Sequence, residues 1–185
     1  MAEALIVVDV QNDFCPGGAL AVPEGDQVIE PLHRLADQVD VVVATRDWHP
    51  PDHHSFEPHG GPWPVHCVRR TEGAELHPAL DRRRIDKVVD AGTVAGTEGF
   101  DKFEDTDLKE YLRGAGVDRV HVGGLALDYC VMQTALSARR HGFDTVVHLD
   151  ATRAVELEPG DGERTIEELR AAGVEVVGER AAAAS

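Results

Sequence analysis

The stretch that decides the fold is RVHVGGLALDYCVMQTALSARRH, residues 119–141. It begins with the pattern of a short buried strand, passes through two glycines and continues as a helical pattern from residue 130. A cysteine at such a strand-to-helix junction meets the partial positive charge and free N–H groups of a helix start, which favour the thiolate. Cys130 is therefore either a reactive nucleophile or a small buried thiol that packs like a hydrophobic residue.

The rest of the chain repeats this alternation of apolar and amphipathic segments. We predict further strands at residues 5–10, 39–45, 85–89, 144–149 and 174–177, and helices at 26–37, 108–113 and 163–171. Strands without polar alternation are buried on both faces, as in a parallel sheet covered by helices. The predicted fold is therefore α/β, a Rossmann-like three-layer α-β-α sandwich with a central, mainly parallel sheet.

Length, charge and cysteine content limit the class of protein. The 185 residues suit a single domain over residues 1–180, followed by a flexible tail at 181–185. A formal net charge of −16 argues against nucleic acid or an anionic membrane as partner. No leader or membrane-spanning run stands out, and three scattered cysteines favour free thiols in a reducing compartment. We expect a cytoplasmic protein, either a monomer or a homo-oligomer.

A histidine-rich loop follows the second predicted strand. Asp47 and His49 come directly after that strand, at the carboxyl edge of the sheet where α/β proteins bind ligands. In an extended segment these two side chains point the same way, and His53 or His54 and then His66 could converge on them. One carboxylate with two or three imidazoles suits Zn²⁺, Fe²⁺ or Mn²⁺. The other interpretation is a set of solvated loop histidines.

Asp9 ends the first predicted strand, at the same edge of the sheet. A carboxylate in this position is either a structural hydrogen-bond acceptor or a catalytic base. Together with Cys130 at the tip of a later strand, it forms a candidate base and nucleophile.

Four blocks of sequence resemble the isochorismatase-like cysteine hydrolases, and among these the nicotinamidases. In chain order they are IVVDVQNDF (residues 6–14), ATRDWHP (44–50), WPVHC (63–67) and GGLALDYC (123–130). The likeness runs from about residue 5 to residue 177, which is nearly the whole chain. It implies a Rossmann-like α-β-α fold and a small-molecule amide substrate, nicotinamide, which is hydrolysed to nicotinate and ammonia.

The resemblance also implies a covalent mechanism. Cys130 matches the nucleophile and Asp9 the base that takes its proton, so the reaction would pass through a thioester. The backbone N–H groups of Ala126 and Cys130 match the oxyanion hole, which in this family depends on a cis peptide between Leu125 and Ala126.

A metal site and a ring pocket are implied in the same way. The family's ligands to one divalent ion match Asp47, His49, His53 and His66, with His54 as the alternative to His53. The ion of this family orients the pyridine ring of the substrate. The residues that match the substrate pocket are Phe14, Trp63, Phe100, Leu125 and Tyr129.

One position departs from the family pattern. The family's third catalytic residue is a lysine after the third strand, where this chain has VVDAGTVAGTEGF, residues 88–100. An alignment on Gly92 and Thr93 puts Ala91 at the position of the lysine. Three explanations remain: a laboratory substitution of lysine by alanine, a natural variant with altered or little activity, or a charge supplied by Lys87 or Lys102. The alternatives to a nicotinamidase are a hydrolase of another small carbamoyl or ureido compound and a non-catalytic binder of the same fold.

Overall fold

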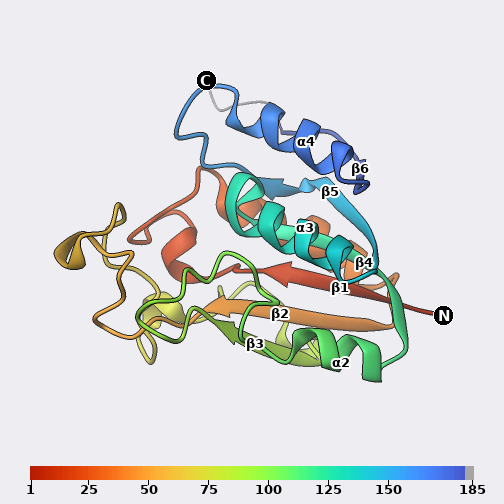
Figure 1. Cartoon of the computed structure of the whole chain (residues 1–185), viewed down its shortest axis with the longest axis horizontal. Helices are drawn as coiled ribbons and strands as arrows, with labels where there is room; N and C mark the ends of the chain where they lie inside the picture. The colour runs from red at the N-terminus through yellow and green to blue at the C-terminus, as the bar shows by residue number, and fades with distance from the viewer. Residues whose placement is uncertain (182–185) are drawn as a thin grey trace.

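The computed structural model describes residues 1–181 and is built on one six-stranded parallel sheet. The strands are β1 Ala2–Val8, β2 Val41–Asp47, β3 Lys87–Ala91, β4 Val117–Leu125, β5 Asp144–Arg153 and β6 Glu175–Val177. Their order across the sheet is β3-β2-β1-β4-β5-β6 (Figure 1). The predicted α/β fold with a parallel sheet is confirmed. Residues 182–185 of the tail predicted at 181–185 lie outside the described residues.

Helices cover both faces of this sheet. They are α1 Ile29–Ala36, α2 Leu108–Gly114, α3 Met132–Arg140 and α4 Asp161–Ala171. Figure 1 shows α2, α3 and α4 on the near face, while the residues of α1 pack into a separate cluster on the other face. Among residues 1–181, no helix is long and apolar enough to cross a membrane.

The two faces of β1 explain why its sequence shows no polar alternation. Ile6 and Val8 pack into the cluster that contains residues of α2, α3 and α4. Leu5 and Val7 point to the opposite face and pack into the cluster that contains residues of α1. Burial of both faces therefore requires an apolar side chain at every position from Ala4 to Val8.

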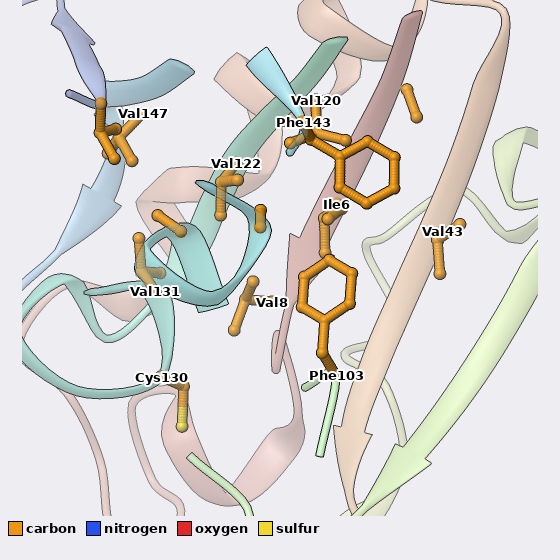
Figure 2. Close-up of a cluster of buried hydrophobic side chains, with 14 of the residues drawn as sticks. Ile6, Val8, Val43, Phe103, Val120, Val122, Cys130, Val131, Phe143 and Val147 are labelled. Carbon is orange, nitrogen blue, oxygen red and sulfur yellow. The ribbon is translucent and has the colours of Figure 1, made fainter. Parts of the chain in front are cut away.

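Cys130 lies at the border of the first cluster. In Figure 2 its side chain lies beyond Val8 and Val131, with the sulfur directed away from the valines of the cluster. Cys130 therefore packs against the hydrophobic cluster on one side, while its sulfur faces away from that cluster.

The direction in which the chain adds strands to the sheet reverses between β1 and β4. The chain adds β2 and β3 on one side of β1 and then returns to place β4 on the other side. In open α/β sheets a crevice forms at such a switch point, beyond the carboxyl ends of the strands, and ligands bind there. Asp9 follows β1 and Cys130 follows β4, so both residues lie at this crevice.

Candidate active site

Asp9 lies where β1 leaves the sheet. Its backbone adopts a left-handed conformation (φ 51°), which aspartate tolerates better than most residues. The side chain is fully buried, and its Oδ1 accepts a hydrogen bond of 2.8 Å from Thr45 Oγ1. Among residues 1–181, none donates a hydrogen bond of good geometry to its Oδ2. One carboxylate oxygen of Asp9, one of Asp47 and the Sγ of Cys130 all lie within 4.8 Å of one another. A carboxylate oxygen with spare acceptor capacity beside a thiol is suited to take a proton from it.

Lys102 places an ammonium group between the two carboxylates. Its Nζ lies 2.7 Å from Asp9 Oδ2 and forms a second, shorter ion pair with Asp47 Oδ1. The lysine side chain is fully buried. Its backbone N–H donates to Thr134 Oγ1 of α3 at 3.2 Å, which ties the segment between β3 and α2 to that helix.

The prediction that Ala91 marks a missing cation is therefore wrong. Ala91 is the buried last residue of β3, paired with Asp47 in the sheet, and the charge comes from Lys102 further along the chain. Lys87, the other candidate, lies at the start of β3 in an outer ion pair of 2.8 Å with Asp107. Of the three explanations, the geometry supports the one that named Lys102, and it gives no support to a binder that has lost its cation.

The buried charges shift one another's pKa values. Burial raises the pKa of Asp9 to about 6, although Lys102 acts in the opposite direction. Burial also acts to raise the pKa of Asp47, but Lys102 and His49 outweigh it and hold that pKa well below the ordinary range. For Lys102, burial acts to lower the pKa, but Asp47 and Asp9 outweigh it and raise the pKa well above the usual value.

The surroundings of Cys130 favour its neutral thiol over the thiolate. Burial raises the pKa of Cys130 well above its usual value; Lys102 opposes this shift, and Asp9 and Asp47 add to it. The thiol therefore needs a base within reach before it can attack a substrate. Asp9 is such a base. A general base works best when its pKa lies near the pH of the reaction, and the raised pKa of Asp9 is nearer to neutral pH than that of an ordinary carboxyl group.

A five-residue π turn, Leu127–Val131, carries Cys130. Helix α3 consequently begins at Met132, two residues after the predicted start at Cys130. The peptide bond between Leu125 and Ala126 is cis, as the resemblance implied. In the described part of the chain no acceptor takes the Ala126 N–H, and none outside the turn takes the Cys130 N–H. Both residues line the same pocket, where the Ala126 N–H is available to a ligand.

Asp47, His49 and His66 form a group that fits a divalent ion. Their ligand atoms lie within 4.8 Å of one another, and His49 Nε2 is 3.3 Å from Asp47 Oδ2. His49 Nδ1 donates to Gly92 O at 2.7 Å, and His66 Nδ1 donates to Pro64 O at 2.8 Å. Because a carbonyl oxygen can only accept, each ring carries a proton on Nδ1, which leaves Nε2 as the nitrogen that could bind an ion. Backbone contacts of this kind orient metal-binding histidines in known sites.

His53 lies beside this group but not in it. Its ring lies 3.9 Å from that of His49, centroid to centroid. Its Nδ1 is 2.7 Å from Ser55 Oγ and its Nε2 is 2.7 Å from Thr97 O, so both nitrogens have other partners. The structure therefore brings together three of the four predicted ligands.

The alternative fourth ligand, His54, is also engaged elsewhere. Its Nδ1 is 2.5 Å from Ala95 O and its Nε2 is 2.9 Å from Glu98 Oε1, at the protein surface. Together with His53 it holds the segment that follows β3 against the histidine loop.

The pocket beside Cys130 has mainly apolar walls. All five predicted substrate-contact residues line it: Phe14, Trp63, Phe100, Leu125 and Tyr129. The Trp63 and Tyr129 rings meet edge to face with their centroids 5.4 Å apart. The predicted metal ligands Asp47, His49 and His66 lie on the same pocket. Such walls suit a flat, uncharged ring with a few polar groups at one end.

Sequence reasoning missed several residues of this site. Leu20, Ala21, Val22 and Val155 also line the pocket but come from loops that carry no recognisable motif. Lys102 did leave a signal, because it lies two residues after Phe100 and directly before Phe103, which packs into the core. A lysine between a half-buried and a buried aromatic residue is itself a candidate for burial.

Comparison with known proteins agrees with this geometry. The chain matches the family model described as the Isochorismatase domain over residues 3–180. It is 40% identical to the nicotinamidase of Escherichia coli, with 92% of each chain covered. It is 44% identical to the nicotinamidase/pyrazinamidase of Mycobacterium tuberculosis, with 95% of this chain and 98% of the relative covered. The crystal structure of the pyrazinamidase of Pyrococcus horikoshii in complex with zinc is 44% identical, with a TM-score of 0.88 over 97% of this chain and 100% of the other. The resemblance inferred from the four sequence blocks is confirmed.

Proposed function

The chain belongs to the isochorismatase family and is an amidohydrolase that acts on a small amide; from this premise we propose that it is a nicotinamidase with Cys130 as its nucleophile. The proposed reaction is the hydrolysis of nicotinamide to nicotinate and ammonia. The observation that carries the proposal is the burial of Asp9, Lys102 and Cys130 together beside a pocket with aromatic walls.

The chemistry begins with the thiol. Asp9 takes the proton of Cys130, and the thiolate attacks the amide carbon, forming a C–S bond and an oxyanion. The N–H groups of Ala126 and Cys130 stabilise the oxyanion; in other enzymes, loss of one such donor costs about 2.7–4 kcal/mol of transition-state stabilisation. The C–N bond then breaks, and the amine leaves as ammonia with the proton that Asp9 returns.

Water completes the cycle by hydrolysing the thioester. Asp9 accepts a proton from the water as it attacks the carbonyl carbon. The C–S bond then breaks, Asp9 returns the proton to the Cys130 sulfur to restore the thiol, and nicotinic acid leaves as the product. Throughout the cycle the Lys102 ammonium lies beside the Asp9 carboxylate and lowers the cost of the negative charge that passes between oxygen and sulfur.

We further propose that Asp47, His49 and His66 hold one divalent ion. Zinc is supported by the relative solved with zinc, and iron and manganese accept the same donors. When bound, the ion would orient the ring nitrogen of the substrate, or waters that bond to it. Metal analysis tests the assignment: wild type should hold about one ion per chain and Asp47→Ala much less, and equal contents would refute it.

The free thiols support a cytoplasmic location. Cys15, Cys67 and Cys130 are unpaired and buried, as expected in a reducing compartment.

Ammonia release from nicotinamide is the direct test of the proposed activity. Wild type should release ammonia and nicotinate in equal amounts, and a quenched reaction should carry a nicotinoyl adduct on Cys130 by mass spectrometry. Cys130→Ala should lose both signals. If ammonia comes from small carbamoyl or ureido compounds and not from nicotinamide, the substrate assignment is wrong while the mechanism stands. Turnover that survives in Cys130→Ala would overturn the covalent mechanism.

A further inference from the structure

Asp47 lies in the last part of β2, which extends beyond the end of the neighbouring strand β1. The last residue pair between β1 and β2 is Val8 with Thr45, because β1 turns out of the sheet at Asp9. Asp47 is two residues further along β2 and still pairs with Ala91 of β3 on its other side. In a parallel sheet the N–H and C=O of one residue point to the same neighbouring strand. The Asp47 N–H and C=O on the β1 side would therefore be buried without a backbone partner.

The side chain of Gln11 fills this gap. Its Oε1 accepts a hydrogen bond of 2.9 Å from Asp47 N, and its Nε2 donates one of 2.8 Å to Asp47 O. The second hydrogen of Nε2 is donated to Ala74 O, also at 2.8 Å. Gln11 is fully buried. The carboxamide thus acts as the peptide group that β1 no longer supplies, and it also ties Asp47 to the loop at Ala74.

We infer that Gln11 is a positioning residue for the metal ligand Asp47. The inference rests on the proposed metal site and adds to it a residue that would touch neither the ion nor the substrate. The carboxylate of Asp47 must face His49 Nε2 at 3.3 Å and Lys102 on its other oxygen. These two contacts are possible together only while the backbone stays extended, and the two Gln11 hydrogen bonds hold it so.

The effect should appear in metal affinity. Groups that orient a ligand without touching the ion typically change affinity by about 10–100-fold when they are replaced. Gln11→Met keeps the length of the side chain and removes both hydrogen bonds to Asp47 as well as the one to Ala74, so we expect Zn²⁺ affinity to fall by about 10–100-fold. Gln11→Glu keeps the shape but turns the donor into an acceptor that faces two carbonyl oxygens, and it should weaken Zn²⁺ binding as well.

Asn12 offers a matched control. It is the next residue of the chain, and its side-chain amide also donates 2.8 Å to a backbone carbonyl, that of Glu72, but at the surface. Asn12→Leu should leave Zn²⁺ affinity within about twofold of wild type, because Glu72 is not among the proposed ligands. Affinity is measured by competition with a chelator, and the absorption spectrum of the Co²⁺-loaded protein reports the ligand geometry.

A double-substitution cycle separates a positioning effect from general destabilisation. If Gln11 acts through Asp47, then adding Gln11→Met to Asp47→Ala should not weaken Zn²⁺ binding any further. A further loss of the same size in both backgrounds would overturn the inference, and so would a Gln11→Met protein with wild-type affinity and Co²⁺ spectrum. If instead Asp47→Ala binds Zn²⁺ as tightly as wild type, the proposed metal site itself is wrong.

The wild-type protein provides a test that needs no variant. Because Gln11 rather than the ion holds the backbone, the Asp47 amide hydrogen should exchange slowly with solvent even after the metal has been removed. Rapid exchange in the metal-free protein would overturn the inference whether or not the Gln11 variants fold.

Discussion

Replacing Lys102 by methionine tests the electrostatic core of the site. The change removes the ammonium that lies 2.7 Å from Asp9 and also pairs with Asp47, while it keeps most of the side-chain volume. At 2.7 Å and an effective dielectric constant of about 20, one such pair has a Coulomb energy of about 6 kcal/mol. Desolvation of both groups offsets part of this energy.

The stability loss should lie near the range measured for broken buried pairs. Removing one partner of such a pair typically lowers the free energy of unfolding by about 3–5 kcal/mol. The pKa of Asp9 is already raised to about 6, so Asp9 can take up a proton in the variant and reduce this cost. Catalysis should suffer more, because a protonated Asp9 cannot accept the thiol proton. We expect kcat/KM to fall by about 10²–10⁴-fold.

The assay is steady-state ammonia release from nicotinamide, combined with urea unfolding of both proteins. Lys87→Met is the matched control, since Lys87 forms an outer ion pair with Asp107 in which the Asp107 side chain is 65% exposed. Such pairs contribute about 0–1 kcal/mol, and kcat/KM should stay within about twofold. A folded Lys102→Met protein whose kcat/KM stays within tenfold of wild type would refute the reasoning.

Three further substitutions probe the site. Ala91→Lys should lower stability by about 1–3 kcal/mol and should not raise kcat/KM, because Ala91 is buried and the cation is already present; a more active variant would contradict this. Gly92→Ala should weaken Zn²⁺ binding at least about tenfold in a chelator competition, because its Cβ would lie 2.5 Å from the His49 ring. The control is Gly96→Ala, whose Cβ meets nothing within 4 Å. Equal Zn²⁺ affinities of the two variants would count against His49 as a metal ligand. Cys130→Ser should lower kcat by at least about 10³-fold while nicotinamide still binds in calorimetry, and a loss of binding instead would argue for a structural role.

The strands and the main catalytic positions could be read from the sequence because they depend on local patterns. The apolar runs around Ile6 and Val43 require burial on both faces, and a parallel sheet brings the residues that follow its strands to one edge. Asp9, Asp47 and Cys130 could therefore be placed together before their coordinates were known.

Lys102 could not be placed in this way. Its ammonium reaches the site because the chain after Ala91 makes an irregular excursion and returns, and that path depends on contacts of His53 and His54 with the loop. The alignment on Gly92 and Thr93 rested on local similarity to the family, and local similarity does not predict where the chain returns to the site. The partners of His53 are also tertiary, since they depend on where Thr97 O lies.

The change of direction between β1 and β4 also constrains how this protein can fold. Asp9, the three predicted ligands and Lys102 all belong to the part of the chain that precedes β4, whereas Ala126 and Cys130 follow it. The two parts are joined by the pairing of β1 with β4, whose residues are far apart in sequence, and such non-local pairing forms slowly. The base and the nucleophile therefore meet only after this long-range step. A newly made chain therefore lacks the paired base and nucleophile, and with them the proposed hydrolysis, until β1 and β4 have paired.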